Sequence, residues 1–281
     1  MSSIFRIFCY KFKAQFKSKR MWLGYMVGIV LIINHSVAYT QYAIEIGEPI
    51  NVLEPFLIAT NNPNSVVFLI LGWLLAMSGT PFIDNISCYI IYRTSRKKWN
   101  FAIVLYICFQ AIIYYIVLLV STIVVGIRNG YWGNVWSYPI AKVTINAGGK
   151  YNINFPYTEL LEVKSVYASV TYTLVLAIGY AILMGLLIYV VSLFGKRNVG
   201  SLAGVLFHFL GYEIMKEGLG YNIDYSMLAR SIPALQIGDN ALTSISDTCI
   251  LYFFGVVILI ELSQEIIRFV DLRVSSAMEE E

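Results

Sequence analysis

Long apolar runs alternate with short polar segments along the whole chain, and this pattern decides its class. A membrane span needs roughly 20 mostly apolar residues, and six segments meet this requirement, at about 21–43, 64–83, 101–126, 167–194, 200–217 and 248–268. The 200–217 segment is the most polar, because it turns polar at Glu213; it crosses with the help of neighbours or bends partway as a buried re-entrant segment. The pattern predicts an all-α, six-span membrane domain over 21–269.

The composition supports this class. Of the 281 residues, 58% are hydrophobic and 13% are charged, and the mean hydropathy is +0.68, whereas soluble domains carry about 25% charged residues. The first apolar run passes into Asn34 and His35 without a cleavage site, so we interpret it as a retained span and not as a signal peptide. The net charge of +3 predicts no nucleic-acid partner. The four cysteines have neither disulfide nor metal-ligand spacing; they are Cys9, Cys88, Cys108 and Cys249.

The cations indicate the orientation. With the N-terminus inside, fourteen of the twenty Lys and Arg residues fall in cytoplasmic segments; six fall outside, at Arg128, Lys142, Lys150, Lys164, Lys216 and Arg230. The first outer loop, at about 44–63, has no cation and three acidic residues. The positive-inside rule therefore predicts a multi-pass protein of the cell membrane with both termini in the cytoplasm, including the tail at 270–281.

Two outer loops are long. The loop at 127–166 alternates around Val143 and Ile145, which predicts a short β-hairpin. The loop at 218–247 contains glycines and Pro233, and we expect a short helix within it.

The N-terminal segment 1–20 has the pattern of an amphipathic interfacial helix. At helical spacing, its apolar residues gather on one side, and they are Ile4, Phe5, Phe8, Phe12 and Phe16. Its cations gather roughly 120° away, at Arg6, Lys13, Lys17 and Arg20, whereas Lys11 and Lys19 break the pattern. The helix is therefore expected to lie on membrane lipids, with its cations toward anionic head groups. This N-terminal helix could act only as a membrane anchor, or it could have a mechanical role; the sequence leaves both functions open.

The stretch "PFIDNISCYIIYRTSRKKWN" at 81–100 separates the second and third spans. Asp84 is a suitable helix N-cap, and Ile83, Ile86, Tyr89 and Ile90 then fall near one helical face. This predicts a capped cytoplasmic helix that is too short to span and has a basic end. The alternative is a positively charged loop that only sets the topology.

This organisation resembles the permease subunit of a bacterial type-two ABC exporter. The motif that carries the resemblance is "PFIDNISCYIIYRTSRKKW", which is similar to the family's first cytoplasmic loop: a Pro-Phe-x-Asp-like start, an apolar helix, then Arg-Thr-x-Ser-Arg-like residues. The resemblance implies a coupling helix seated in a cleft of the ATPase, with contacts from Asp84, Ile86, Tyr89, Ile90, Arg93 and Arg96. It also implies a smaller contact from "FGKRNVG". The long 127–166 loop departs from the simplest family pattern.

No ATPase signature is present. The "AGGK" at 147–150 lacks the spacing and the hydroxyl residue of a phosphate-binding loop, so ATP and Mg²⁺ would be bound by a separate ATPase subunit. We find no catalytic, cofactor or metal motif in this chain, and we interpret His35 and His208 as packing or hydrogen-bonding residues.

Two small-xxx-small patterns occur, at Gly24–Gly28 and Gly200–Gly204. Such glycines let helices approach closely. They serve packing within one subunit or, as the resemblance implies, a dimer that meets through the first and fifth spans with a second permease copy or a homologue. Glu261 in the last span forms a structural hydrogen bond to a neighbouring helix or has a proton or substrate role.

The sequence thus favours the membrane subunit of an ATP-driven exporter for an amphiphilic cargo, such as a peptide, an antimicrobial or a lipid-linked molecule. The alternative is a non-transporting sensor or immunity protein that binds a ligand through the 127–166 loop. A membrane-embedded enzyme is a third reading, but no reactive set of residues supports it.

Overall fold

The computed structural model describes residues 3–81, 89–91, 93–145, 151, 153, 155, 157–194, 197–217, 223–237 and 243–269. Helices make up most of these residues. The α-helices are α1 (Ser3–Phe16), α2 (Lys19–Ile46), α3 (Glu54–Asn61), α4 (Pro63–Met77), α6 (Arg96–Gly126), α7 (Tyr138–Ile145), α8 (Thr158–Val163), α9 (Val166–Phe194), α10 (Arg197–Glu217) and α11 (Ile245–Phe269). The remaining elements are the strands β1 (Ile50–Asn51) and β2 (Gly130–Tyr131) and the 3₁₀ turns η2 (Ile223–Tyr225), η3 (Ala229–Ser231) and η4 (Pro233–Gln236).

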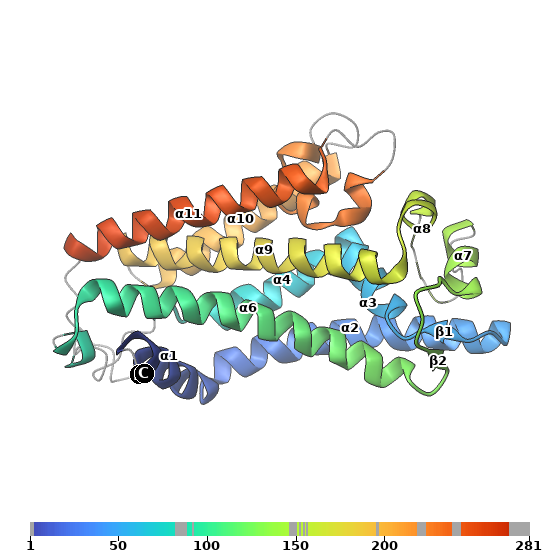
Figure 1. Cartoon of the computed structure of the whole chain (residues 1–281), viewed down its shortest axis with the longest axis horizontal. Coiled ribbons are helices and arrows are strands. Elements are labelled where there is room, and N and C mark those ends of the chain that lie inside the picture. Colours follow the sequence, from blue (N-terminus) through green and yellow to red (C-terminus); the bar gives the residue numbers. More distant parts are fainter. Residues whose placement is uncertain are drawn as a thin grey trace.

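The long helices lie side by side along the longest axis of the molecule (Figure 1). One end of this bundle gathers α1, the start of α6 and the end of α11. We name it the basic end, because Arg96, Lys97, Lys98 and Arg268 lie there. The opposite end gathers α3, β1, β2, α7 and α8, and we name it the loop end.

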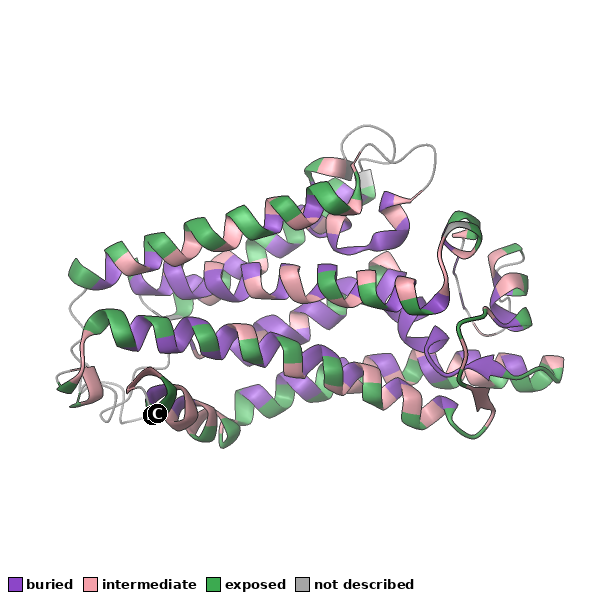
Figure 2. Ribbon diagram, in the orientation of Figure 1, coloured by how far each residue is buried: buried purple, intermediate pink, exposed green. Residues whose placement is uncertain are grey.

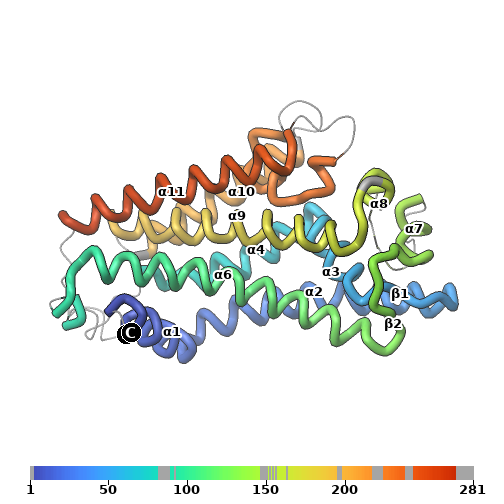
Figure 3. The backbone as a smooth tube through the Cα atoms, in the orientation of Figure 1, coloured from blue at the N-terminus to red at the C-terminus, as the bar shows by residue number. Residues whose placement is uncertain are grey.

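Four of the described helices, α2, α6, α9 and α11, are long and apolar enough to cross a membrane. The pair α3 and α4 passes as a fifth if it counts as one span, although the two helices are bent by 90° at their junction, a turn that can be followed in Figure 3. Helix α10 is long enough, with 21 residues, but it is too polar to join them. The structure therefore supports a multi-pass helical membrane protein with four or five candidate spans, and the number six stays a prediction.

The second predicted span is shorter than expected. Its helix α4 ends at Met77 and not near residue 83, so its 15 residues rise about 22 Å, less than the ~30 Å of a bilayer core. The break before α4 has a local cause. The Asn62 side chain accepts hydrogen bonds from the backbone N–H groups of Asn64 and Ser65, and Pro63 occupies the first helical position.

Along the bundle, the buried side of each long helix faces its neighbours (Figure 2), and many exposed side chains on these helices are large and apolar. Helix α9 is central, since it packs against α3, α4, α6, α10 and α11. Large aromatic side chains fill the space around it, among them Trp73, Tyr114, Tyr180 and Tyr189. Because lipid is as apolar as these side chains, helix association here depends on close packing and on interhelical hydrogen bonds.

The predicted N-terminal helix is present as α1, and its place at the membrane interface stays a prediction. The rings of Phe8 and Phe12 pack edge-on against Phe109 of α6, with centroids 5.5 and 5.9 Å apart. Phe16 and the basic residue Lys13 stay exposed. Helix α1 thus lies beside the bundle at its basic end and is attached to α6 by its apolar face.

The prediction of a β-hairpin around Val143 and Ile145 is wrong, because these residues belong to helix α7. Pro139 is its second residue, and Pro139, Ile140 and Val143 are buried, a helical spacing of one, three and four positions. Ile145 is 76% exposed, so the apparent alternation had no buried face behind it. The short helix expected in 218–247 is present as η2, η3 and η4.

Candidate functional site

Between α4 and α6, the structure describes residues 78–81, 89–91 and 93–95. Residues 89–91 are helical, and Thr94 ends the turn, because its backbone N–H and its Oγ1 donate to the Ile90 carbonyl at 3.0 and 2.7 Å. Tyr89 is 74% exposed, whereas Ile90 packs against the core. The predicted contact residues Asp84 and Ile86 lie outside the described residues.

Arg96 does not belong to this short helix; it is the first residue of α6. Its Nη1 donates to the backbone carbonyls of Ile267 and Arg268, at 3.2 and 2.9 Å. The last carbonyls of a helix have no partner within it and carry partial negative charge, so a guanidinium there is stabilising. The structure therefore uses Arg96 to join the start of α6 to the end of α11, whereas the resemblance implied a contact with the ATPase.

One turn deeper, a buried polar group joins three helices. Asn100 of α6 donates from Nδ2 to Ser263 Oγ of α11 at 2.9 Å, and Tyr189 of α9 donates to Asn100 Oδ1. All three side chains are fully buried. Buried side-chain hydrogen bonds of this kind commonly contribute about 0.6–2 kcal/mol in membrane bundles, so the basic ends of α6, α9 and α11 are held as one unit.

The glycines of α2 face helices of the same chain. A Cβ added at Gly24 would meet the Gly72 carbonyl oxygen and lie 2.7 Å from the Ala76 backbone nitrogen, both in α4. A Cβ at Gly28 would meet the Tyr114 hydroxyl of α6. These positions therefore allow α2 to pack closely against α4 and α6.

The glycines of α10 have the same surroundings. A Cβ at Gly200 would meet Ser192 Oγ and lie 2.9 Å from the Ser192 backbone nitrogen, and one at Gly204 would lie 2.6 Å from Ile188 Cγ1. Both partners belong to α9. The structure thus brings all four predicted glycines to helix contacts within one subunit, and a role for them between two copies stays a prediction.

A buried carboxylate at the loop end escaped the sequence analysis. Glu54 is fully buried at the start of α3. Its Oε2 accepts from Tyr39 OH at 2.8 Å, from Ser137 Oγ at 2.6 Å and from the Asn51 backbone N–H at 3.2 Å; its Oε1 accepts from the Ser137 backbone N–H at 2.6 Å. Burial raises the pKa of the Tyr131 phenol on β2, and the nearby Glu54 carboxylate raises that pKa further.

The same place joins the two loops. Ile50 and Asn51 of β1 pair in parallel with Gly130 and Tyr131 of β2. The Asn51 side chain donates to the carbonyls of Gly133 and Val135. One carboxylate and one short strand pair therefore fix the 127–145 region on α2 and α3. The sequence showed only that the first loop is acidic. It did not show the hydrogen-bond partners of Glu54.

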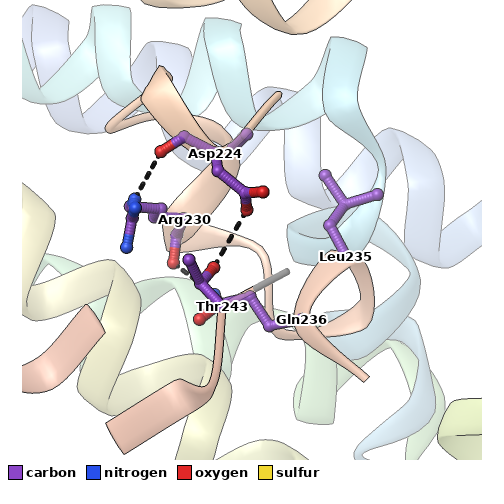
Figure 4. Close-up of a pocket in the computed structure, with 6 residues that line it drawn as sticks. Asp224, Arg230, Leu235, Gln236 and Thr243 are labelled. Atoms are coloured by element: carbon purple, nitrogen blue, oxygen red, sulfur yellow. Dashed lines mark hydrogen bonds between the residues drawn. The ribbon is translucent and has the colours of Figure 1, made fainter. Parts of the chain in front are cut away.

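A small pocket lies in the connection between α10 and α11 (Figure 4). Its polar groups bond one another: Thr243 Oγ1 donates to Asp224 Oδ1 at 3.0 Å, and Arg230 Nε donates to the Asp224 carbonyl at 2.6 Å. Gln236 Nε2 donates to the Arg230 carbonyl at 2.5 Å. These contacts shape the turns η2 to η4, and we assign no ligand to the pocket.

Both histidines are hydrogen-bonded inside the bundle, which agrees with the expectation for them. His208 of α10 is fully buried between Tyr180 OH and the Val67 carbonyl, each at 3.1 Å, so its Nε2 carries the proton that the carbonyl accepts. His35 of α2 lies 2.7 Å from Ser65 Oγ. Glu261 is exposed on α11, and Glu265 pairs with Arg268 at 2.8 Å.

Within the described part of the chain, no group of three or more His, Cys, Asp or Glu residues is arranged to hold a metal ion. No protein-family model, no curated protein and no solved structure matches this chain. What the geometry establishes is a helical, multi-pass membrane protein with four or five candidate spans, one end rich in cations and one end built from ordered loops.

Proposed function

We propose that this chain is the membrane subunit of an ATP-driven exporter, powered by a separate ATPase and working beside a second copy of itself. The observation that carries the proposal is Tyr89, a large aromatic side chain that is 74% exposed on a short helical segment between two membrane helices. Such a side chain suits a cleft on a soluble partner, because aromatic anchors supply most of the binding energy at interfaces.

The attachment of this segment supports a mechanical role. Thr94 closes its turn on Ile90, Ser95 caps α6 by accepting from the Lys98 N–H at 3.3 Å, and Arg96 holds the end of α11. A push on the segment would therefore reach α6 and α11 through hydrogen bonds and not through a slack loop. Helix α1 packs on α6 at the same end and would move with it.

The exposed faces of the bundle differ in a way that supports a second copy. The exposed large side chains of α6 are apolar from Phe101 to Val124, as a lipid contact requires. The α2 face instead carries exposed Asn34, about 16 Å along the helix from Leu23 and so near mid-bilayer. No hydrogen bond joins Asn34 to another described side chain. Amides in this setting bond across helices, so we place the second copy on the α2 side.

The cargo in this proposal is an amphiphile: a peptide, an antimicrobial or a lipid-linked molecule. A second function, a non-transporting sensor or immunity protein, draws on a different observation. Trp132, Val135, Tyr138 and Ile145 are each at least 60% exposed in the ordered region after α6, and an apolar surface there suits a ligand outside the membrane. The copurification described next separates the two functions, because the sensor needs no ATPase.

The test is copurification of an ATP-binding-cassette ATPase with this chain, in detergent, from cells that express both. Tyr89→Ala removes an anchor and should cost at least about 2 kcal/mol, roughly a thirtyfold loss of affinity. The matched control is Tyr225→Ala, at a tyrosine that is 77% exposed in η2, between α10 and α11; it should retain the ATPase. Native mass spectrometry of the same samples should show two copies of the chain.

The proposal fails if the unmodified chain retains no ATPase, or if Tyr89→Ala retains as much ATPase as Tyr225→Ala does. A mass that corresponds to a single copy would remove the dimer from the proposal and leave the ATPase partner to be judged by copurification alone.

A further inference from the structure

We propose that the ATPase contact at the basic end has a second half, formed by the C-terminal end of α11. This inference rests on the proposed function and adds a contact that the coupling-helix resemblance did not include. The joint contact surface consists of Tyr89, Arg93, Lys97, Lys98, Arg268 and Phe269.

The two halves are brought together by Arg96. Its guanidinium bonds the carbonyls of Ile267 and Arg268, so the side chains of Arg268 and Phe269 start from backbone that is tied to the first residue of α6. The buried Asn100–Ser263 hydrogen bond repeats this connection one turn deeper. A partner that binds the segment before α6 therefore also contacts the end of α11, because the hydrogen bonds of Arg96 fix the position of one relative to the other. About 170 residues separate these two parts of the contact in the sequence.

The surface combines two exposed aromatic rings with cations. Tyr89 is 74% exposed and Phe269 is 86% exposed. Arg93, Lys97 and Lys98 are exposed, and no ion pair between described residues involves them. Arg268 pairs with Glu265 but keeps 45% of its side chain exposed. The partner that fits is a protein with acidic groups around apolar sockets, since opposite charges favour encounter and buried rings supply affinity.

The position of the surface favours a soluble protein over lipid. The start of α6 and the end of α11 project beyond the start of α2 along the long axis of the molecule (Figure 1). Helix α1, whose exposed Phe16 and Lys13 suit a membrane interface, lies between these two levels. The contact surface is therefore further from the apolar part of α2 than the interfacial helix is.

The test places a benzophenone amino acid at Tyr89, at Phe269 or at Phe253, and irradiates membranes that contain both this chain and the copurifying ATPase. Phe253 is the matched control, because it is 65% exposed on the apolar face of the same helix α11. We expect the ATPase to be crosslinked from positions 89 and 269 but not from 253. Arg96→Ala should reduce the crosslink from position 269 several-fold, whereas Lys13→Ala, at an exposed cation of α1 outside the contact surface, should not.

Each result decides the matter. A crosslink from position 89 without one from 269, or with only lipid crosslinked at 269, overturns the second half of the surface and leaves the proposed function standing. An unchanged crosslink at 269 in Arg96→Ala overturns the role of Arg96 in placing it. No ATPase crosslink from either position contradicts the proposed function itself, together with this inference.

Discussion

At the scale of single residues, Glu54 shows how this protein buries a carboxyl group among hydrogen-bond donors, with no ion pair to a described cation. Its carboxylate accepts four hydrogen bonds, and two of the donors are backbone N–H groups, those of Asn51 and Ser137. Hydroxyl donors can rotate and become acceptors, but a backbone N–H cannot. Both oxygens of residue 54 must therefore accept a hydrogen bond from a backbone N–H group. A carboxylate offers two such acceptor oxygens, whereas a carboxamide offers one.

Glu54→Gln tests this at nearly constant volume. The amide NH₂ must face one of the two backbone N–H groups, which leaves a buried donor unsatisfied at a cost of about 1–3 kcal/mol. We expect a lower thermal midpoint in detergent and faster amide hydrogen exchange over residues 130–137. Glu48→Gln, at an exposed acid of the same loop, is the control and should change neither. Equal behaviour of the two variants would show that the carboxylate is not what holds the loop.

At the scale of elements, α2 and α4 meet through backbone. Gly24 and Gly72 face each other so closely that either Cβ would enter the other's helix: one at Gly72 would lie 2.8 Å from the Gly24 carbonyl oxygen. Small residues at a helix crossing let the two backbones approach closely, so van der Waals packing and weak polar contacts form along a long interface. The sequence pattern did indicate close approach at Gly24 and Gly28, but the identity of the neighbouring helix depends on the fold.

Gly24→Ala should destabilise the bundle, because backbone atoms of α4 must shift to make room. Overpacking of this kind typically costs about 1–3 kcal/mol, and we expect a lower thermal midpoint with the same oligomeric state below it. Gly126→Ala is the matched control: its Cβ would lie at 3.6 Å or more from all neighbours, so the midpoint should hold or rise slightly. If Gly24→Ala separates subunits and leaves the midpoint unchanged, Gly24 acts between copies and not within one.

At the scale of the whole molecule, the two ends differ in charge and construction. The cations of α6 and α11 gather at the basic end, and the ordered loops gather at the other. If positive-inside orientation holds, the contact surface with Tyr89 faces the cytoplasm and the Glu54 site faces outward. The orientation rests on the charge pattern and stays a prediction.

Cysteine labelling tests the orientation of the chain in the membrane. In a chain whose four native cysteines are replaced by alanine, Ile145→Cys should react with a membrane-impermeant maleimide on intact cells, since this position is 76% exposed at the loop end. Arg93→Cys, which is exposed at the basic end, should react only after the membrane is made permeable. The reverse labelling would invert the topology and remove the ATPase contact from the cytoplasm.

The sequence alone determined the class of protein, the presence of the N-terminal helix α1 and the positions of α2, α6, α9 and α11. These follow from local composition, because a bilayer demands a continuous apolar run and internal hydrogen bonding from each span separately. It misjudged α7, where two β-branched residues at alternate positions imitated a strand. It also extended the second span to residue 83, whereas α4 ends at Met77, before Ser78, Gly79, Thr80 and Pro81.

Only the tertiary structure decided what the polar residues do. Arg96 reaches the end of α11, Glu54 binds Ser137, and Gly24 faces Gly72. The partners in each contact are far apart in the sequence, so the helical or strand periodicity of one segment cannot predict them. The physical reason is that each span must be apolar enough for the lipid around it, which depends on that segment alone. A buried polar group or a close glycine contact depends instead on which segments pack together in the interior.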